Sequence, residues 1–407
     1  MQSNIEWGLG KEGDLRGEMK SGKNDRLANP RRSVILNVIC KICQKGGWAV
    51  REFFKRHRGV HIWAAAVIAL FLFYGWAISS REAANAVSAA TQVIKDGYAR
   101  FWYLFPFSVV EWFYVAFILV VIAWVAVVIH RLRTRPERGH TAYGGLLGLA
   151  CLCFTVWGIT CVLWGVNYYA DGFQEKSGIY AQPVTVEELE RVATYFAENV
   201  GELADQVERD ENGVFAVDRD DIFAESTAIY ENISQEFPFL AREDRVPKKM
   251  FFSRLFSAMN FTGFYSPYTG ESNLNVDSPA CLLPATIAHE LAHQRGIASE
   301  QECNFLAIAA STSSDSLVYQ YSGYLMGYIH LGNALYRADR DRWEQVYALL
   351  PEEVVADLRY HSAYWDQFEG LTAQVSQQIY DTTLRSYGQT DGIQSYGTVV
   401  DLLVAYY

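Results

Sequence analysis

The chain has 407 residues, of which 50% are hydrophobic, and it carries a formal net charge of −11 at pH 7. The charge is unevenly spread: 20 of the 35 Lys and Arg residues but only 10 of the 46 Asp and Glu residues lie before position 169, so residues 1–168 carry +10 and residues 169–407 carry −21. An acidic carboxyl-terminal part, with no phosphate-binding loop and no nucleic-acid-binding motif, excludes nucleic acid from the expected partners.

The first segment of the chain is polar. Residues 1–34 are rich in Gly, Ser, Lys, Asn and Glu, and such a composition cannot bury enough apolar surface to fold alone. We expect residues 1–58 to form a largely disordered cytoplasmic tail, with a short interfacial helix at residues 33–50. The CxxC sequence at Cys40 and Cys43 has no second pair with which to bind zinc, so the expected role is packing at the membrane surface, with palmitoylation as an alternative.

Three apolar segments within residues 59–169 are long enough to cross a bilayer. They cover residues 61–80, 109–129 and 143–168, each with about 20 residues or more. Their only acidic residue is Glu111, near the start of the second segment. Trp and Tyr residues gather toward the segment ends, as in the aromatic belts of membrane proteins. The sequence therefore predicts a transmembrane region of three helices, with the lipid bilayer as one partner.

Basic residues predict the orientation of these segments. Four of them closely precede the first segment and four more fill the link between the second and third, whereas the loop at residues 83–107 contains only Lys95 and Arg100. Because cytoplasmic loops are enriched in Lys and Arg, the amino terminus is predicted to be cytoplasmic and residues 170–407 extracytoplasmic. No small-residue cleavage pattern follows the first segment, which is therefore interpreted as an anchor of a multi-pass cell-membrane protein.

Residues 170–407 are predicted to form a mainly helical domain with a small strand region. Thr185 and Glu188 form a capping box ahead of apolar residues at helical spacing, and a second helix is expected at residues 220–237. Gly and Pro interrupt an aromatic stretch at residues 251–275, which predicts one or two short strands. Further helices are expected at residues 284–296, 299–313, 315–336, 340–349, 351–369, 371–388 and 395–406.

An HExxH box lies in the first of these later helices. His289 and His293 are four residues apart and so share one face of a helix, where both imidazoles can bind one Zn²⁺. Glu290 follows His289 and would lie beside the water that such a metal holds. This pattern is typical of zinc hydrolases in which the glutamate acts as the base.

A catalytic zinc site needs a third protein ligand, and two acidic residues follow the box closely. Gly296 is expected to end the first helix and Ser299 to cap the next, with Glu302 completing a Ser-x-x-Glu capping box. This structural role for Glu302 leaves Glu300 as the preferred third ligand. Glu302 as the ligand and a site without a catalytic metal are the alternatives. Asn304 lies one turn after Glu300 and is expected to fix the tautomer of a ligand imidazole.

Over residues 261–271, 283–296 and 300–305, this chain resembles a bacterial family of membrane-anchored HExxH proteins. The family is the zinc-peptidase-like domain of unknown function 3810. The similarity runs from the membrane segments to the carboxyl end. It implies a mostly helical α+β domain with a gluzincin-like site, in which His289, His293 and Glu300 bind zinc and Glu290 is the base. Gluzincins often have Asp where this chain has Asn304.

The expected function is that of a membrane-anchored zinc metallopeptidase that hydrolyses a peptide or protein substrate, with a zinc-bound water activated by Glu290. The alternative is a noncatalytic membrane protein whose exterior domain binds a partner, with zinc structural or absent. His330 and Tyr396, together with Tyr321 and Tyr324, are candidate donors to the oxyanion, and packing is the competing role for each of them.

Two further expectations concern the surroundings of the HExxH helix. Residues 270–275 are expected to supply an edge strand for an extended substrate, with an ordinary loop as the alternative. Cys281 and Cys303 bracket the helix, and they are expected either to pair in a disulfide or to pack as small apolar residues.

Overall fold

The computed structural model describes residues 50–387 and 397–407, and the chain divides into two compact units, residues 1–61 and 62–407. The predicted tail at residues 1–34, nearly all of the predicted interfacial helix, the CxxC sequence and Tyr396 lie outside the described residues. In the first unit, the described residues are helical apart from a turn at His57, and they include the start of α2 (Arg58–Ala77). Everything that follows concerns the second unit.

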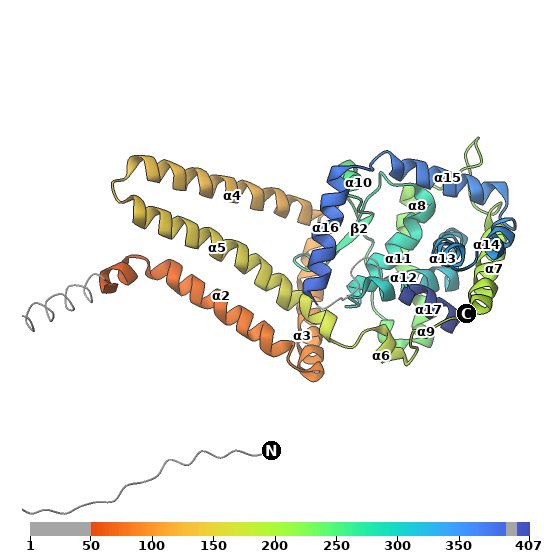
Figure 1. Cartoon of the computed structure of the whole chain (residues 1–407), viewed down its shortest axis with the longest axis horizontal. Coiled ribbons are helices and arrows are strands. Elements are labelled where there is room, and N and C mark those ends of the chain that lie inside the picture. The colour runs from red at the N-terminus through yellow and green to blue at the C-terminus, as the bar shows by residue number, and fades with distance from the viewer. Residues whose placement is uncertain (1–49, 388–396) are drawn as a thin grey trace, which may run out of the picture. The chain divides into compact units, whose positions relative to one another are not determined.

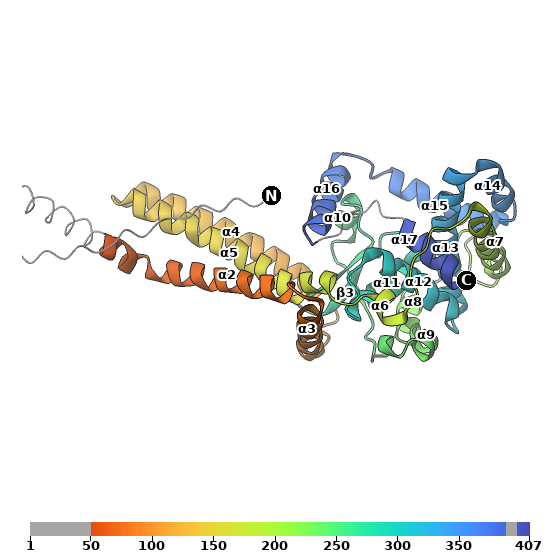
Figure 2. The same ribbon diagram turned by 60° about the horizontal axis from the view of Figure 1, so that its bottom comes forward.

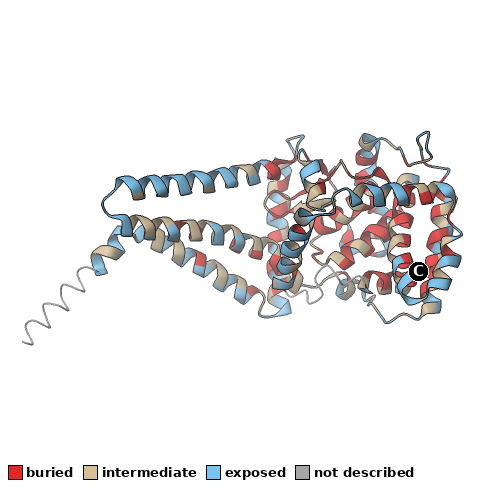
Figure 3. Cartoon of the chain, turned by 45° about the horizontal axis from the view of Figure 1, so that its top comes forward, coloured by how far each residue is buried: buried red, intermediate tan, exposed pale blue. Residues whose placement is uncertain are grey.

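Three helices are long and apolar enough to cross a membrane, as predicted: α2, α4 (Val109–Thr134) and α5 (Arg138–Leu163). Much of their surface is exposed, in contrast to the buried interior of the carboxyl-terminal helices (Figure 3). The third helix begins and ends earlier than predicted, and the chain continues after it as the 3₁₀ helix η1 (Gly165–Tyr169). The length and composition of these helices indicate a membrane-associated protein.

The helices α4 and α5 pack closely near the short link that joins them. A Cβ atom at Gly145 would lie 2.7 Å from Val128, and one at Gly148 would lie 2.4 Å from Trp124, so glycine permits this close approach. The indole Nε1 of Trp124 also donates to the carbonyl of Gly145 at 3.0 Å. Away from the link the two helices diverge toward the carboxyl-terminal helices (Figure 1).

The predicted loop at residues 83–107 connects the first two apolar helices as expected, but most of it forms a helix that was not predicted, α3 (Arg81–Trp102). Its sequence lacks the continuous apolar run of a membrane-spanning helix, but it has the Ser80 cap and the buried positions at helical spacing of an amphipathic one. α3 runs across the ends of the three apolar helices (Figures 1 and 2). Its fully buried Lys95 donates to the carbonyl of Leu163, at the end of α5, over 3.1 Å, and burial lowers the pKa of Lys95 to about 7. This contact joins α3 to the carboxyl end of α5.

The carboxyl-terminal helices enclose one hydrophobic core. The long helix α13 (Leu317–Ala338) packs there against α7 (Val186–Leu203), which begins with the capping box predicted at Thr185. Gly327 makes this packing possible, because a Cβ atom at that position would lie 2.1 Å from the ring of Phe196. The close packing of α13 on α7 in this core therefore requires glycine at position 327.

The other helices follow the predicted order with small shifts at their ends. The helix predicted at residues 220–237 is broken into α8 (Arg219–Glu225), η2 (Ser226–Ala228) and α9 (Glu231–Glu236), and the hydroxyl of Ser226 donates to the carbonyl of Phe223 at this break. The helices predicted after residue 284 are confirmed as α11 (Leu283–Gln294), α12 (Glu300–Ser313), α13, α14 (Arg340–Tyr347), α15 (Glu352–Asp366), α16 (Leu371–Ser386) and α17 (Gly397–Tyr406). Short helices complete the described chain at α6 (Phe173–Ser177), η3 (Pro238–Leu240), α10 (Ser253–Ala258) and η4 (Ala280–Leu282).

The predicted strand region forms a sheet of three short strands in the order β1-β3-β2. β3 (Glu271–Leu274) is central, pairing in parallel with β1 (Lys248–Lys249) and antiparallel with β2 (Gly263–Ser266). The prediction that residues 270–275 supply an edge strand is therefore wrong, because both sides of β3 are used within the sheet. The edge strand near the HExxH helix is β2.

Two buried glutamates join α4 to the sheet region. The carboxylate of Glu271 accepts hydrogen bonds from the first two backbone amides of α4, at 3.4 and 3.2 Å, and forms a buried ion pair with Lys248. In the opposite direction, Glu111 of α4 accepts from the amides of Phe251 and Phe252 at 2.9 Å each, just before α10. Each carboxylate thus satisfies amide groups at or just before a helix N-terminus in the other part of the structure.

Candidate metal centre

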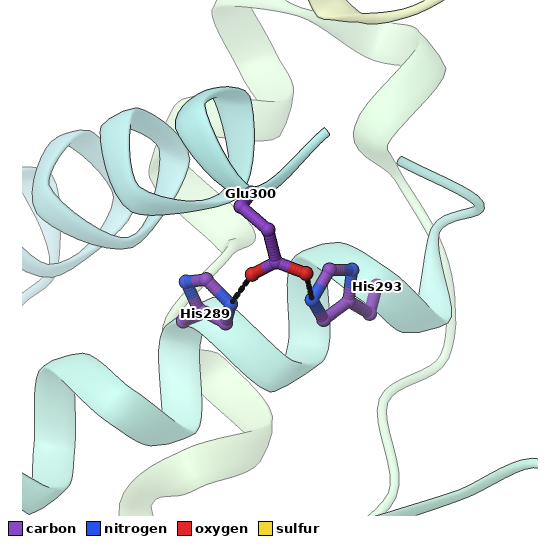
Figure 4. Close-up of side chains that lie close together, drawn as sticks. All are labelled: His289, His293 and Glu300. Carbon is purple, nitrogen blue, oxygen red and sulfur yellow. Dashed lines mark ion pairs between the residues drawn. The ribbon is translucent and has the colours of Figure 1, made fainter. Parts of the chain in front are cut away.

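Three side chains with metal-binding chemistry converge between α11 and α12. Nε2 of His289 lies 3.2 Å from one carboxylate oxygen of Glu300, and Nε2 of His293 lies 3.6 Å from the other (Figure 4). All three ligand atoms lie within 4.8 Å of one another. The structure therefore brings together the two histidines of the HExxH box and the preferred third ligand.

The connection between the two helices explains this convergence. Gly296 follows α11 with a φ of 82°, a left-handed conformation that residues with a side chain rarely adopt. Ser299 then caps α12 by accepting a hydrogen bond from the amide of Glu302 at 3.4 Å. This short turn places Glu300, the first residue of α12, beside the histidines of α11.

Hydrogen bonds to the second ring nitrogens orient both imidazoles. Nδ1 of His289 lies 2.8 Å from Oδ1 of Asn304, and Nδ1 of His293 lies 2.9 Å from the carbonyl oxygen of Ile297. A carbonyl oxygen can only accept, so Nδ1 of His293 carries a proton. In the neutral ring, Nε2 then presents its lone pair toward Glu300, as a ligand imidazole requires.

The donor set and its spacing fit Zn²⁺. Two imidazole nitrogens and a carboxylate are a common set for catalytic zinc, which holds each ligand at about 2.0–2.1 Å in tetrahedral geometry. Two ligand atoms of such a shell lie roughly 3.3–3.4 Å apart. Nε2 of His289 lies 3.2 Å from Oε2 of Glu300, and Nε2 of His293 lies 3.6 Å from Oε1, so each imidazole is near this spacing from one carboxylate oxygen. Three ligands leave the fourth position for a water or a substrate oxygen.

The charges of the site are coupled. Burial disfavours a charge on His293, but the neighbouring Cys303 and Glu300 outweigh burial and hold the pKa of His293 well above its usual value. Burial likewise raises the pKa of Glu300, but the two imidazoles outweigh it and hold that pKa well below the usual carboxyl value. Both shifts have one cause: Glu300 and the neighbouring imidazoles stabilise each other's charged forms.

Glu290 lies beside this cluster with only 3% of its surface exposed. Its Oε2 has no hydrogen-bond partner among the described residues. Burial raises the pKa of Glu290 to about 7, and the nearby His293 and His289 oppose that rise. The side chain is close to β2, since a Cβ atom at Gly263 would lie 2.8 Å from its Oε1.

Glu302, the alternative ligand, lies apart from the cluster. Its carboxylate accepts hydrogen bonds from the amides of Phe173 and Gln174, at 2.8 and 3.1 Å, and so caps α6. Only half of the predicted capping box forms: Ser299 accepts from the amide of Glu302, but the Glu302 carboxylate caps α6 instead of returning to the start of α12. The prediction that Glu302 completes the box is therefore wrong.

Tyr380 is a neighbour of the site that the sequence did not reveal. It lies on α16, and its hydroxyl donates to Oε1 of Glu300 at 2.6 Å. Its ring also packs edge-on against Phe261, with the ring centroids 5.4 Å apart. No local motif marks this residue among the 25 tyrosines of the chain, because its contact with Glu300 depends on how α16 folds back.

The predicted oxyanion donors are placed differently. Tyr321 is buried in the core and donates to Asp357, while the hydroxyl of Tyr324 lies 3.3 Å from that of Tyr195. His330 lies on α13, outside the lining of the metal-site cavity, and burial, followed by the charge of His289, lowers its pKa to about 4. Tyr396 lies outside the described residues.

Cys281 and Cys303 are both free thiols in buried positions, so they do not form a disulfide. Sγ of Cys303 lies 3.3 Å from Nδ1 of His293 and 3.4 Å from the carbonyl of Ile297. This places Cys303 behind the imidazole, on the side away from the ligand nitrogen.

The three ligand side chains and Glu290 line a cavity of about 600 Å³. Its walls come from β2, α11, α12, α16 and η1, and also from α4 and α5. Aromatic side chains are frequent in the lining, among them Trp164, Tyr168, Phe264, Tyr268, Tyr380 and Tyr387. Apart from the tyrosine hydroxyls, the ionisable side chains among the lining residues are His289, His293, Glu300 and Glu290.

Comparison with known proteins identifies a family but no closer relative. No curated protein and no solved structure matches the chain. Residues 89–404, from α3 into α17 and thus including the whole metal cluster and its cavity, match one family described as a protein of unknown function (DUF3810). The chain therefore belongs to the DUF3810 family of proteins of unknown function.

Proposed function

We propose that the protein is a membrane-anchored, zinc-dependent metallopeptidase of gluzincin type. The observation that carries the proposal is the convergence of His289, His293 and Glu300 around a common point, with the carboxylate of Glu290 beside it. A structural zinc site needs four ligands and no neighbouring base, whereas three ligands and a buried glutamate suit hydrolysis.

Each of these residues has a separate role in the proposed hydrolysis. Zn²⁺ bound by the three ligands would polarise the scissile carbonyl and make a water more acidic. Glu290, through its unpartnered Oε2, accepts one proton of that water as its oxygen bonds to the carbonyl carbon, and then passes the proton to the amine as the C–N bond breaks. The hydroxyl of Tyr380, 2.6 Å from Glu300, is a candidate to donate to the oxyanion.

The free edge of β2 supports a peptide as the substrate. Gly263, Phe264 and Tyr265 of this strand line the cavity beside Glu290, and β2 pairs with β3 on one side only. An extended peptide can add to such an edge through main-chain hydrogen bonds, which positions its carbonyl groups without reading its sequence.

The compartment of the reaction is part of the proposal. Basic residues precede α2 and fill the link between α4 and α5, while the loop that contains α3 has few. By the positive-inside rule, the amino terminus is cytoplasmic and the metal centre faces the outside of the cell membrane.

The test uses the full-length protein purified in detergent, with bound zinc measured by elemental analysis and cleavage measured on a peptide library. Wild type should bind zinc stoichiometrically and cleave peptides. Glu290→Gln should retain zinc but lose cleavage by about 10²–10⁴-fold, because only the general base is removed.

Two further variants separate the ligands. Glu300→Ala should lose zinc, whereas Glu302→Ala should keep it, because the carboxylate of Glu302 caps α6. Zinc-loaded wild type with no more cleavage than Glu290→Gln would point instead to a noncatalytic protein with a structural metal.

A further inference from the structure

We infer that the cavity receives the juxtamembrane segment of a membrane-anchored polypeptide, which reaches the metal centre from the bilayer through the space between α4 and α5. This inference rests on the proposed peptidase function and specifies its substrate class. It narrows the substrate from any peptide to a membrane-anchored one, because the apolar helices then form part of the cavity as well as the anchor.

The first observation is that two residues of the apolar helices line the metal-site cavity. Tyr114 lies in the second turn of α4 and Thr160 in the last turn of α5. At 1.5 Å per residue, these positions lie about 8 and 5 Å inside the ends of their helices. The cavity thus extends alongside parts of α4 and α5 that carry exposed apolar side chains, such as Phe113 and Ile159.

The second observation is that this end of the cavity is accessible. The side chain of Tyr114 is 42% exposed although it lines the cavity, so one side of it faces outward. The helices α4 and α5 lie close together near their link, at Gly145 and Gly148, and they diverge toward their other ends (Figure 1). Tyr114 and Thr160 belong to those other ends.

The hairpin of β2 and β3 bridges the divergent ends of the two helices. The ring of Phe264 in β2 packs against Tyr114, with the centroids 6.1 Å apart. At the hairpin turn, Tyr268 bonds to the hydroxyl of Thr160 and donates to the carbonyl of Val156 at 3.1 Å. The strand offered to a substrate is therefore held directly against both apolar helices.

The third observation favours a polypeptide over a lipid. Away from the apolar helices, Thr262, Thr286 and Met326 line both the metal-site cavity and a second hollow of about 140 Å³. His361 lines that hollow and a further one of about 200 Å³. This series of hollows beyond the metal centre suits an extended chain, whereas a lipid would need only the apolar end.

The placement predicts where hydrolysis occurs. With the anchoring segment at Tyr114 and Thr160, the bond at His289, His293 and Glu300 belongs to the first residues outside the bilayer. Water adds across that peptide bond, giving a carboxylate on one fragment and an amine on the other, with Glu290 carrying the proton between them. One product keeps the membrane anchor and the other is released.

The test uses full-length protein in proteoliposomes and a randomised peptide library fused to a synthetic Leu-rich transmembrane helix. A second version carries a long Gly/Ser spacer between the helix and the library, and a third has no anchor. We expect cleavage of the directly fused library to exceed that of the spacer version by at least about tenfold, although both share the high effective concentration of the bilayer. Equal cleavage of the two anchored libraries, or preference for the soluble one, would overturn the inference while leaving the peptidase function intact.

A second measurement does not depend on catalysis. A photo-cross-linking residue replaces Tyr114 in the Glu290→Gln protein, and the matched control replaces Leu119, which is 59% exposed on α4 and about 140° around the helix from Tyr114. The anchored peptide should cross-link from position 114 and not from position 119. Cross-links from position 114 to phospholipid alone would show that lipid fills the cavity mouth, and the inference would be wrong even if soluble peptides are cleaved.

Discussion

At the scale of single residues, the proposed metal centre would depend on the groups that orient His289 and His293 as much as on these residues and Glu300. Nδ1 of His289 meets Asn304 and Nδ1 of His293 meets the carbonyl of Ile297, so each ring has one nitrogen occupied and the other directed at Glu300. The spacing of four residues from Glu300 to Asn304 places both side chains on one face of α12. This is why the role of Asn304 was predictable from the sequence.

Asn304→Ala should weaken zinc binding by about 10–100-fold, because the imidazole of His289 loses the acceptor that orients it. Asn304→Asp, which keeps an acceptor oxygen, should bind zinc nearly as tightly as wild type. Zinc affinity is measured by competition with a chelator, and thermal unfolding shows whether each variant is folded. Equal affinity in the alanine variant and wild type would contradict this role.

At the scale of elements, the site is built where a strand edge meets a helix. β2 lies against α11 so closely that Gly263 has no room for a side chain: a Cβ atom there would lie 2.8 Å from Oε1 of Glu290 and 3.1 Å from the carbonyl of Asn273. The strand signals in the sequence predicted the sheet, but the order β1-β3-β2 decides which strand has a free edge. That order depends on the parallel pairing of β1 with β3, which no local pattern specifies.

Gly263→Ala should reduce peptide cleavage by up to about 10²-fold while zinc remains bound, because the added methyl group displaces Glu290 rather than the ligands. Gly97→Ala is the matched control, since a Cβ atom at Gly97 meets nothing within 4 Å. Zinc content and cleavage are measured on both. Loss of zinc from the Gly263 variant would mean that β2 supports the metal cluster itself.

At the scale of the whole molecule, the apolar helices α4 and α5 and the carboxyl-terminal helices belong to one compact unit. The carboxylate of Glu271 in the sheet accepts from the first two amides of α4, and the carboxylate of Glu111 in α4 accepts from the two amides just before α10. The hydrogen bonds therefore run in both directions between α4 and the sheet region. Glu111 is the only acidic residue of the three predicted membrane segments. In the structure it is only 2% exposed and joins α4 to the segment before α10.

Glu111→Ala should leave the amides of Phe251 and Phe252 without their acceptor and destabilise the junction by about 1–3 kcal/mol. Hydrogen exchange in detergent should then be faster at these two amides than in wild type. Glu82→Ala, which removes an exposed carboxylate from α3, is the control and should leave their exchange unchanged. Unchanged exchange in the Glu111 variant would show that this contact does not hold the junction.

The sequence alone determined what depends on neighbours along the chain. Hydropathy marked three apolar helices, the spacing of four residues placed His289 and His293 on one face, and the capping signals at Gly296 and Ser299 located the turn that presents Glu300. Tertiary structure decided what depends on distant segments. Tyr380 reaches Glu300 across 80 positions, β2 becomes the free edge, and Tyr114 and Thr160 join the metal-site cavity. The periodicity of a helix is visible in its own residues, whereas a contact between remote elements leaves no local pattern to read.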